Sequence, residues 1–286
     1  MGWRFTEDVE EYARAAGPLL AARPAEHTVS LTVIENARAR NAAAERAEPE
    51  VFGWWTDATG AVRGAVSHTP GYQLLLGEVP DEAMRPLASE LLTLGRRPPG
   101  VTGVTPLAVE FAAVWSALAG ERAVLDVAMR LYRLGELVPP DPAPPGRARP
   151  ATVDDTDLLI DWMHRFGEDA GMPMHDVPDT VADRLSHGGL TLWEDPEGTS
   201  VSLAGRTRPA AGVVRIGPVY TPPERRRHGW GAAVTAAASR ATLDEGAREV
   251  VLFTDLANPT TNEIYQRLGY RPVSDRAVLA FEAATP

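Results

Sequence analysis

A proline-rich run in the middle of the chain is the feature that most restricts how this sequence can fold. The segment VPPDPAPPGRARPAT, from Val138 to Thr152, holds six of the 25 prolines. Proline fixes φ and has no backbone N–H, so such a run forms neither a helix interior nor a central strand. We therefore predict an interdomain linker at residues 138–149, between a domain at 1–137 and a domain at 150–286.

Composition and charge exclude several classes of protein. The 286 residues are 44% hydrophobic and 23% charged, as in globular domains with a core. There is no cysteine, which excludes disulfides, zinc–thiolate sites and a cysteine acyl-enzyme. The six histidines show no metal-ligand spacing, so no metal is expected. The formal net charge of −11 argues against nucleic-acid binding. Without a long apolar run or a signal-peptide core, we expect a cytoplasmic protein without a membrane span.

Both halves of the chain predict mixed α/β structure. In the second half, hydrophobic periodicity and cap residues predict a helix at 154–166, strands at 190–193, 200–204, 211–220, 249–254 and 276–281, and helices at 230–243 and 259–268. In the first half, strands are predicted at 29–34, 51–55, 72–76 and 101–104, and helices at 81–94 and 106–118. The order of elements is similar in the two halves, although no sequence repeat is evident.

The segment PPERRRHGWGAAV, residues 222–234, joins a predicted strand to a predicted helix and is unusually basic for this chain. Gly229 and Gly231 allow a ligand to approach the backbone closely. The amides of residues 227–232 lie at a helix start, where unpaired N–H groups and the helix dipole favour an anion. These features predict a pyrophosphate site. The alternative is a solvated arginine cluster, and the segment matches neither a Walker loop nor a dinucleotide fingerprint.

The strand before this segment is interrupted by Gly217-Pro218. Because proline cannot donate to a sheet ladder, a bulge or a splay is expected there. Unpaired groups of the strand could then bond an extended, amide-bearing ligand as an added strand would. The alternative is that Pro218 only marks an edge strand.

The sequence VYTPPERRRHGWGAAV resembles motif A of the GNAT superfamily, the acyl-CoA-dependent N-acetyltransferases. The family pattern, Arg/Gln-x-x-Gly-x-Gly/Ala after a strand, falls on residues 226–231, and the resemblance covers about residues 150–286. It implies a GNAT-type acyl-CoA transferase fold in this half, with acetyl-CoA as acyl donor. The cofactor-binding residues that it implies are Val219, Tyr220 and Thr221 for the pantetheine arm, and Arg226, Arg227, His228, Gly229, Trp230, Gly231 and Ala232 for the pyrophosphate.

A second family signature follows in NPTTNEIYQRLGY. Asn258 precedes Tyr265 by seven residues, which is two helical turns along one face. A leucine–glycine–aromatic turn then follows, as in similar family members. The resemblance implies that Asn258 holds the cofactor and that Tyr265 acts as general acid to the leaving thiolate. By itself, Asn258 would be explained as a helix N-cap, and Tyr265 as a packed aromatic residue.

The general base is not identified by the sequence. Some family members carry a glutamate eleven residues before the first arginine of motif A, but Arg215 stands there and cannot serve as a base. Glu168 and Asp169, in the loop after the first helix of this half, are weak candidates to line the acceptor pocket. Glu194 is a third candidate, and a water chain would require no residue.

The first half lacks the motif. Its strand at 72–76 leads into GEVPDEAMRPLASELL, where Asp81 and Glu82 stand in place of arginines. This half is either a degenerate GNAT-like domain without cofactor or an unrelated α/β domain.

The sequence thus predicts an acetyl-CoA-dependent N-acetyltransferase. We expect an amine acceptor, either a small molecule or a peptide, to attack the thioester directly in a ternary complex, since no cysteine could form an acyl-enzyme. The alternatives are a non-catalytic acyl-CoA-binding or regulatory protein, and a transferase for a longer acyl-CoA. The sequence does not specify the acceptor or the oligomeric state.

Overall fold

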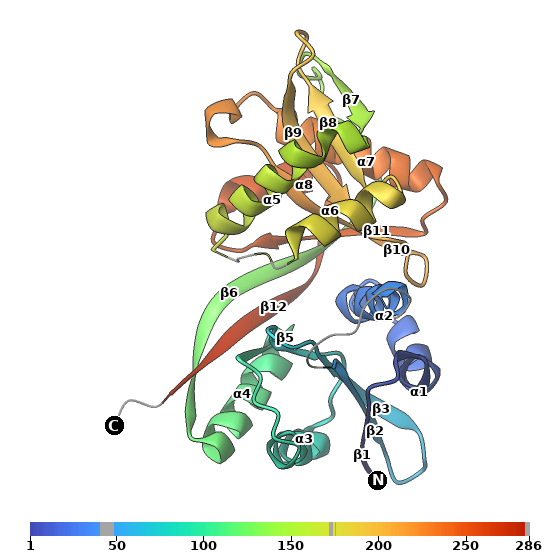
Figure 1. The fold of residues 1–286 in the computed structure, drawn as a ribbon, viewed down its shortest axis with the longest axis vertical. Helices are drawn as coiled ribbons and strands as arrows, with labels where there is room; N and C mark the ends of the chain where they lie inside the picture. Colours follow the sequence, from blue (N-terminus) through green and yellow to red (C-terminus); the bar gives the residue numbers. More distant parts are fainter. Residues whose placement is uncertain (41–48, 172–173, 175, 284–286) are drawn as a thin grey trace. The chain divides into compact units, whose positions relative to one another are not determined.

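The computed structural model describes residues 1–40, 49–171, 174 and 176–283, which form two compact units (Figure 1). Unit 1 contains Met1–Leu131, Thr254–Ala257 and the chain from Val273 onward, and unit 2 contains Tyr132–Phe253 and Asn258–Pro272. These units do not coincide with the predicted division at 138–149. The first segment of unit 1 ends at Leu131, before the predicted linker, and unit 1 also includes Thr254–Ala257 and most of the final strand of the chain.

Unit 2 is built on a mixed sheet. Four antiparallel strands follow one another in the order β7 (Arg147–Pro150), β8 (Leu190–Glu194), β9 (Ser200–Arg206) and β10 (Val213–Tyr220), and β11 (Glu249–Asp255) then pairs parallel to β10. Helices α5 (Thr156–Asp169) and α6 (Val177–Ser186) precede β8, α7 (Trp230–Asp244) joins β10 to β11, and α8 (Pro259–Arg267) follows β11. The predicted mixed α/β fold is confirmed.

Unit 1 repeats this succession. Its antiparallel strands are β1 (Gly2–Thr6), β2 (Val51–Thr56), β3 (Val62–His68) and β4 (Leu74–Leu76), and β5 (Gly100–Val104) is parallel to β4. Helices α1 (Val9–Ala21) and α2 (Thr28–Arg40) precede β2, α3 (Asp81–Thr93) joins β4 to β5, and α4 (Thr105–Ala119) follows β5. The strand β12 (Tyr270–Ala283) pairs antiparallel with β5 through residues 276–280. A long strand, β6 (Glu121–Leu134), follows α4.

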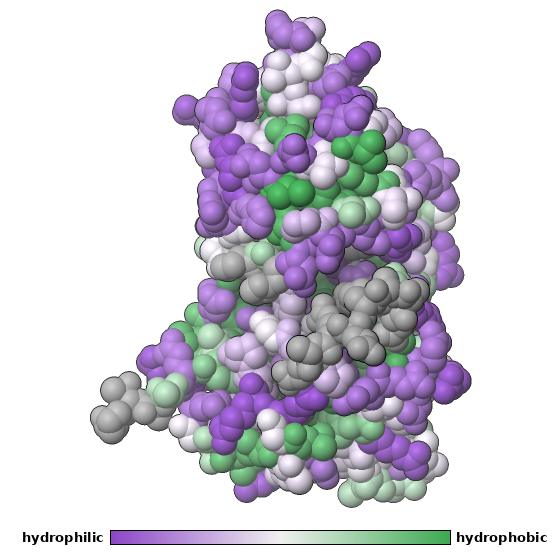
Figure 2. Space-filling view, viewed as in Figure 1, coloured by the Kyte–Doolittle hydropathy of each residue, from purple (hydrophilic) through white to green (hydrophobic). Residues whose placement is uncertain are grey.

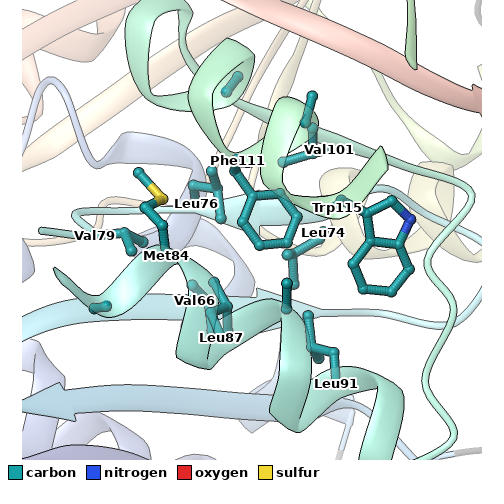
Figure 3. Packing of buried hydrophobic residues seen from close by; sticks show 14 of the residues in the cluster. Val66, Leu74, Leu76, Val79, Met84, Leu87, Leu91, Val101, Phe111 and Trp115 are labelled. Carbon is teal, nitrogen blue, oxygen red and sulfur yellow. The ribbon is translucent and has the colours of Figure 1, made fainter. Parts of the chain in front are cut away.

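Each unit has its own hydrophobic core. In unit 1, Phe111 and Trp115 of α4 pack with Met84 and Leu87 of α3 against Leu76 of β4 (Figure 3). Unit 2 has two clusters, one around α7 and α8 and the other around α5 and α6. The face drawn in Figure 2 is mostly hydrophilic, with smaller hydrophobic patches in both units.

One prediction about an individual element is wrong, and one segment has more structure than expected. The predicted strand at 29–34 lies in α2, where Leu31, Ile34 and Ala37 are buried at helical spacing, so packing overrides the β-branched composition. The predicted linker also ends in a strand, because Arg147–Pro150 pairs with β8 at the edge of the sheet, where a terminal proline is tolerated.

Candidate functional site

The strand β10 loses its parallel partner halfway along. Its register with β11 pairs Val213–Ile216 with Glu249–Leu252 and extends no further between these two described strands. The register with β9 shifts between Ile216 and Val219. The interruption predicted at Gly217-Pro218 is therefore present, and the edge of β10 that faced β11 is open beyond it.

The side chains of adjacent residues at the end of β10 pack into different hydrophobic clusters. Val219 packs against the cluster of α7 and α8, whereas the Tyr220 ring lies in the cluster of α5 and α6, 6.0 Å from the ring of Trp162. Ser202 Oγ donates to the Tyr220 carbonyl at 3.0 Å and lies 2.8 Å from Thr221 Oγ1. The carbonyl of Tyr220 is thus already bonded.

The turn between β10 and α7 has the backbone of an anion-binding loop. A short 3₁₀ turn at Pro223–Arg225 leads to Arg227 at φ 68° and Gly229 at φ 81°, and α7 begins at Trp230. Among the described residues, no carbonyl accepts from the amides of residues 227–232, and the next amide, Ala233, bonds Gly229 at 3.1 Å. Unpaired amides that surround a left-handed residue at a helix start form a concave site for an anion.

Glycine is favoured at positions 229 and 231 of this turn for two different reasons. Gly229 adopts a left-handed conformation that other L-residues adopt at a cost, although a Cβ there would make only ordinary contacts with Pro144. At Gly231, a Cβ would lie 3.3 Å from Thr221 Oγ1. Gly229 therefore sets the conformation of the turn, and Gly231 lets the helix start approach the end of β10.

The three arginines of the turn have different surroundings. Arg226 Nε donates to the Thr221 carbonyl at 2.9 Å, and its guanidinium forms an ion pair with Asp169. Arg225 and Arg227 have no ion-pair partner within the described part of the chain. Asp169 is thus bound to the turn, whereas Glu168 is exposed on the last turn of α5. Two cations remain beside the unpaired amides.

The His228 ring fastens the turn, a role that sequence reasoning missed because it considered only the His228 backbone. Its Nδ1 lies 2.8 Å from the Arg226 carbonyl and 3.2 Å from the Arg225 carbonyl, so Nδ1 must carry the hydrogen. The ring stacks on Trp230 with 4.5 Å between centroids and 15° between planes. A histidine two residues before a tryptophan at a helix start is the signal for this arrangement.

Asn258 caps α8. Its Oδ1 accepts from the Thr261 amide at 3.1 Å, and its carbonyl accepts from Asn262 Nδ2 at 2.8 Å. The alternative interpretation of Asn258 as a helix cap is therefore satisfied. No hydrogen bond among the described residues uses the side-chain Nδ2 of Asn258, so this nitrogen is available to a ligand.

Tyr265 is a buried phenol in the same cluster as Val219 and Trp230. Burial raises its pKa to about 12, so the phenol is protonated at neutral pH. Its ring meets the Tyr270 ring edge-on at 6.1 Å, and nothing in the described chain hydrogen-bonds its hydroxyl. The cluster brings the end of β10, the start of α7 and Tyr265 together.

Two other tyrosines hold the helix of Tyr265 in place. The sequence indicated Tyr270 only as the aromatic residue of the turn after this helix, and it gave no role to Tyr132. The Tyr132 hydroxyl donates to Asn262 Oδ1 at 2.9 Å and accepts from Gln266 at 3.2 Å. The Tyr270 hydroxyl lies 2.7 Å from Ser239 Oγ of α7. These bonds fix α8 against β6 and α7. Their spacing in the sequence gives no signal, since they join segments far apart in the chain.

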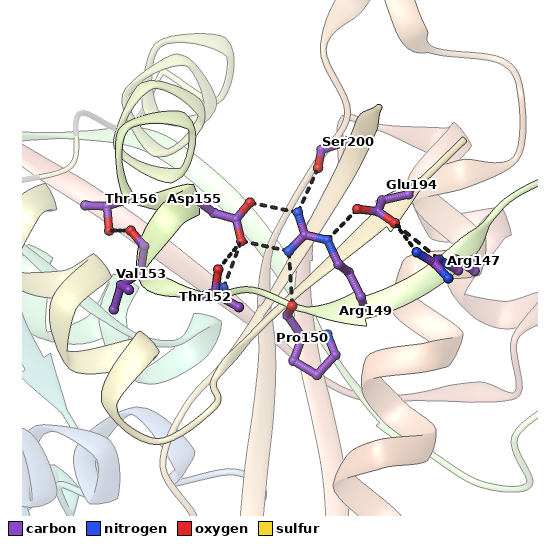
Figure 4. A network of polar contacts seen from close by, with 9 residues as sticks. All are labelled: Arg147, Arg149, Pro150, Thr152, Val153, Asp155, Thr156, Glu194 and Ser200. Atoms are coloured by element: carbon purple, nitrogen blue, oxygen red, sulfur yellow. Dashed lines mark hydrogen bonds and ion pairs between the residues drawn. The ribbon is translucent and has the colours of Figure 1, made fainter. Parts of the chain in front are cut away.

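Glu194 is committed to a polar network (Figure 4). Its carboxylate accepts from Arg149 Nε at 2.5 Å and from Arg147 at 3.2 Å, and the Arg149 hydrogen bond in particular lowers the pKa of Glu194. Arg149 also binds Asp155 through two 2.7 Å bonds. A carboxylate held by two arginines is a poor general base, so the structure favours a structural role for Glu194.

Comparisons with known proteins agree with this geometry. Residues 197–278 match the family described as FR47-like protein. Three of the solved structures that share the fold are described by their similarity to this chain. The first is a Drosophila protein, at 13% identity and TM-score 0.70, with 99% of each chain covered. The second is a tandem GNAT protein from the clavulanic acid biosynthesis pathway, at 15% identity and TM-score 0.60, again with 99% of each chain covered.

The third is a GCN5-related N-acetyltransferase from Sphaerobacter thermophilus, at 18% identity and TM-score 0.60, covering 97% of this chain and 94% of that one. Among curated proteins, none matches the sequence significantly. The resemblance to GNAT proteins is confirmed in fold over both units, and the sequence match over residues 197–278 is to the FR47-like family. None of the described helices is long and apolar enough to cross a membrane.

Proposed function

We propose that unit 2 is an acetyl-CoA-dependent N-acetyltransferase. The observation that carries this proposal is the set of unpaired amides at residues 227–232, which continues from the open edge of β10. An extended pantetheine arm fits the open edge, and a pyrophosphate fits the amides. Arg225 and Arg227, which lack ion partners among the described residues, add charge where phosphates would lie.

The proposed reaction is direct attack on the thioester. Acetyl-CoA supplies an acyl carbon activated by a thiol leaving group. The acceptor amine forms the C–N bond, an amide of β10 near Val219 polarises the thioester oxygen, and the C–S bond breaks. Tyr265 donates to the departing sulfur, and the amine proton leaves through water, because no free carboxylate is assigned as base.

The raised pKa of Tyr265 refines its proposed role. An ordinary thiol has a pKa of about 8.5, so full transfer of a proton from a phenol with a pKa of about 12 is unfavourable. Tyr265 therefore acts first by hydrogen bonding to the developing thiolate, and transfers its proton late, as the sulfur charge becomes complete. As proposed, it remains the general acid of the reaction.

Calorimetric titration with acetyl-CoA tests the proposal. We expect saturable binding by the intact chain and a collapse of affinity in Arg226→Ala/Arg227→Ala. Arg240→Ala, which removes an exposed arginine from the body of α7, is the matched control. Absence of binding by the intact chain would refute the proposal.

Two alternatives share the same site. If acetyl-CoA binds but no amine accelerates its cleavage, a non-catalytic acyl-CoA-binding or regulatory protein is favoured, as the unassigned base would suggest. If longer acyl-CoA thioesters react faster than acetyl-CoA, the enzyme is a transferase for those donors.

A further inference from the structure

Unit 1 contains a cavity at the place in its fold that corresponds to the amide-lined turn of unit 2. The cavity has a volume of about 510 Å³ and lies where β4 ends and α3 begins. It is lined by residues 77–80 and Glu82 of this connection, by the chain between α1 and α2, by the β2–β3 hairpin and by the start of α4. This volume is within the range for small-molecule sites.

The chemistry of this connection disfavours an anion. Pro80, which has no N–H to offer, is the N-cap of α3, and Asp81 and Glu82 occupy its first turn. Carboxylates at a helix start already interact with the helix dipole and repel a phosphate. The β10–α7 turn of unit 2 has amides and arginines, whereas the corresponding β4–α3 connection of unit 1 is acidic.

The arginines that line the cavity are already bound to carboxylates. Arg23 donates to Glu26 at 3.0 Å and also to Glu78. Arg63 donates to Asp57 at 3.1 Å. The charge of each of these two arginines is therefore already paired with a carboxylate of the lining.

Several acceptors of the lining have no partner among the described residues. His27 is only 4% exposed, and its Nε2 lies 3.1 Å from Glu78 Oε1, so the hydrogen is on Nε2 and Nδ1 is an acceptor. Nothing in the described chain hydrogen-bonds Nδ1 of His27, Oε2 of Glu78 or the carboxylate of Glu82. Burial, with the charges of Arg23 and Arg276, lowers the pKa of His27 to about 4, so Nδ1 stays unprotonated.

We propose that this cavity binds a small organic cation, an alkyl amine or diamine. One ammonium group would donate to Glu78 Oε2 and His27 Nδ1, and a second to Glu82, while Val104 and Leu107 would face the methylene groups. The lining has four carboxylates and two arginines, and the buried Arg276, bonded to the Glu26 carbonyl at 3.2 Å, leaves one negative charge in excess. Among the described residues, no group of three acidic or histidine side chains could hold a metal ion, so an organic cation is favoured.

Calorimetric titration of the full chain with 1,4-diaminobutane tests this proposal independently of acyl transfer. We expect saturable binding, no binding of succinate, which has the same number of carbons and the opposite charge, and no competition by magnesium chloride at equal ionic strength. Glu78→Gln and Glu82→Gln should each weaken binding about tenfold. Glu110→Gln, which removes an exposed carboxylate of α4 outside the lining, should leave affinity unchanged.

The variants separate this cavity from any amine site elsewhere. Glu82 has no described partner, so Glu82→Gln keeps the test decisive even if Glu78→Gln unfolds. Equal affinity in Glu82→Gln and Glu110→Gln, or no saturable binding by the intact chain, would overturn the proposal.

Discussion

Replacing Gly229 by alanine should separate the conformation of the β10–α7 turn from the general stability of α7. Gly229 lies at φ 81° at the start of the helix, and Gly246 lies at φ 91° just beyond its end. A Cβ at Gly229 would make ordinary contacts, and a Cβ at Gly246 would meet nothing within 4 Å. Both substitutions should therefore carry mainly the cost of a left-handed alanine, about 1–2 kcal/mol.

For a chain of this size, that cost lowers Tm by roughly 2–8 °C in either variant. The two variants should differ in ligand binding, since only Gly229 shapes the amides of residues 227–232. Loss of one charge-assisted hydrogen bond, about 1.5–3 kcal/mol, corresponds to roughly tenfold or more in affinity. We expect Gly229→Ala to weaken acetyl-CoA binding by at least this factor, and Gly246→Ala to leave it unchanged.

Thermal unfolding followed by circular dichroism and calorimetric titration with acetyl-CoA measure both quantities. If the two variants lose equal stability and bind acetyl-CoA equally, the turn is not the pyrophosphate site. If Gly229→Ala loses no stability, the argument from backbone strain is wrong.

Three further predictions follow from the site, the polar network and β12. Tyr265→Phe should lower kcat roughly 10²–10⁴-fold without changing acetyl-CoA affinity. Tyr270→Phe should mainly lower stability. Because the pKa of Tyr265 is about 12, steady-state rates should show no loss of its proton below about pH 10. An equal effect of the two substitutions on kcat would contradict this role. The Arg149 hydrogen bond lowers the pKa of Asp155 to about 2. The pair therefore stabilises the fold above the ordinary carboxyl pKa, and this stability is lost as pH falls through about 2. In Arg149→Met, the free energy of unfolding in urea should decline less between about pH 5 and 2. An unchanged profile would show that the pair contributes nothing. Deletion of residues 273–283 removes Ala277 and Leu279 from the core of unit 1, so limited proteolysis should digest unit 1, and a protease-resistant unit 1 would refute this packing argument.

Local sequence signals predicted the elements that have strong periodicity and clear caps. The helices α3, α4, α7 and α8 and the strands β8–β11 were anticipated within a few residues, because each has its hydrophobic period and its turn residues in one short segment. The interruption of β10 was predictable for the same reason, since Gly217-Pro218 acts locally. The strands β3 and β6 and the helices α1 and α6 were not anticipated.

Local sequence signals did not predict features that depend on contacts between residues far apart in the chain. The segment at 29–34 has β-branched residues but forms a helix, in which Leu31 and Ile34 are buried on one face. Glu194 was a candidate base, yet Arg147 and Arg149 of the predicted linker bind it. His27 Nδ1 is an acceptor because His27 Nε2 contacts Glu78, 51 residues away, and no local pattern indicates that contact.

The pairing of β5 with β12 has a consequence for how the chain is made. Residues 100–104 pair with residues 276–280, more than 170 positions later. At synthesis rates of roughly 5–20 residues per second, the edge of β5 waits on the order of 10–30 s for its partner strand to emerge. The residues of unit 2 are synthesised during this interval, so the unit that begins first is completed last, and its open strand edge is the place where a nascent chain would need protection.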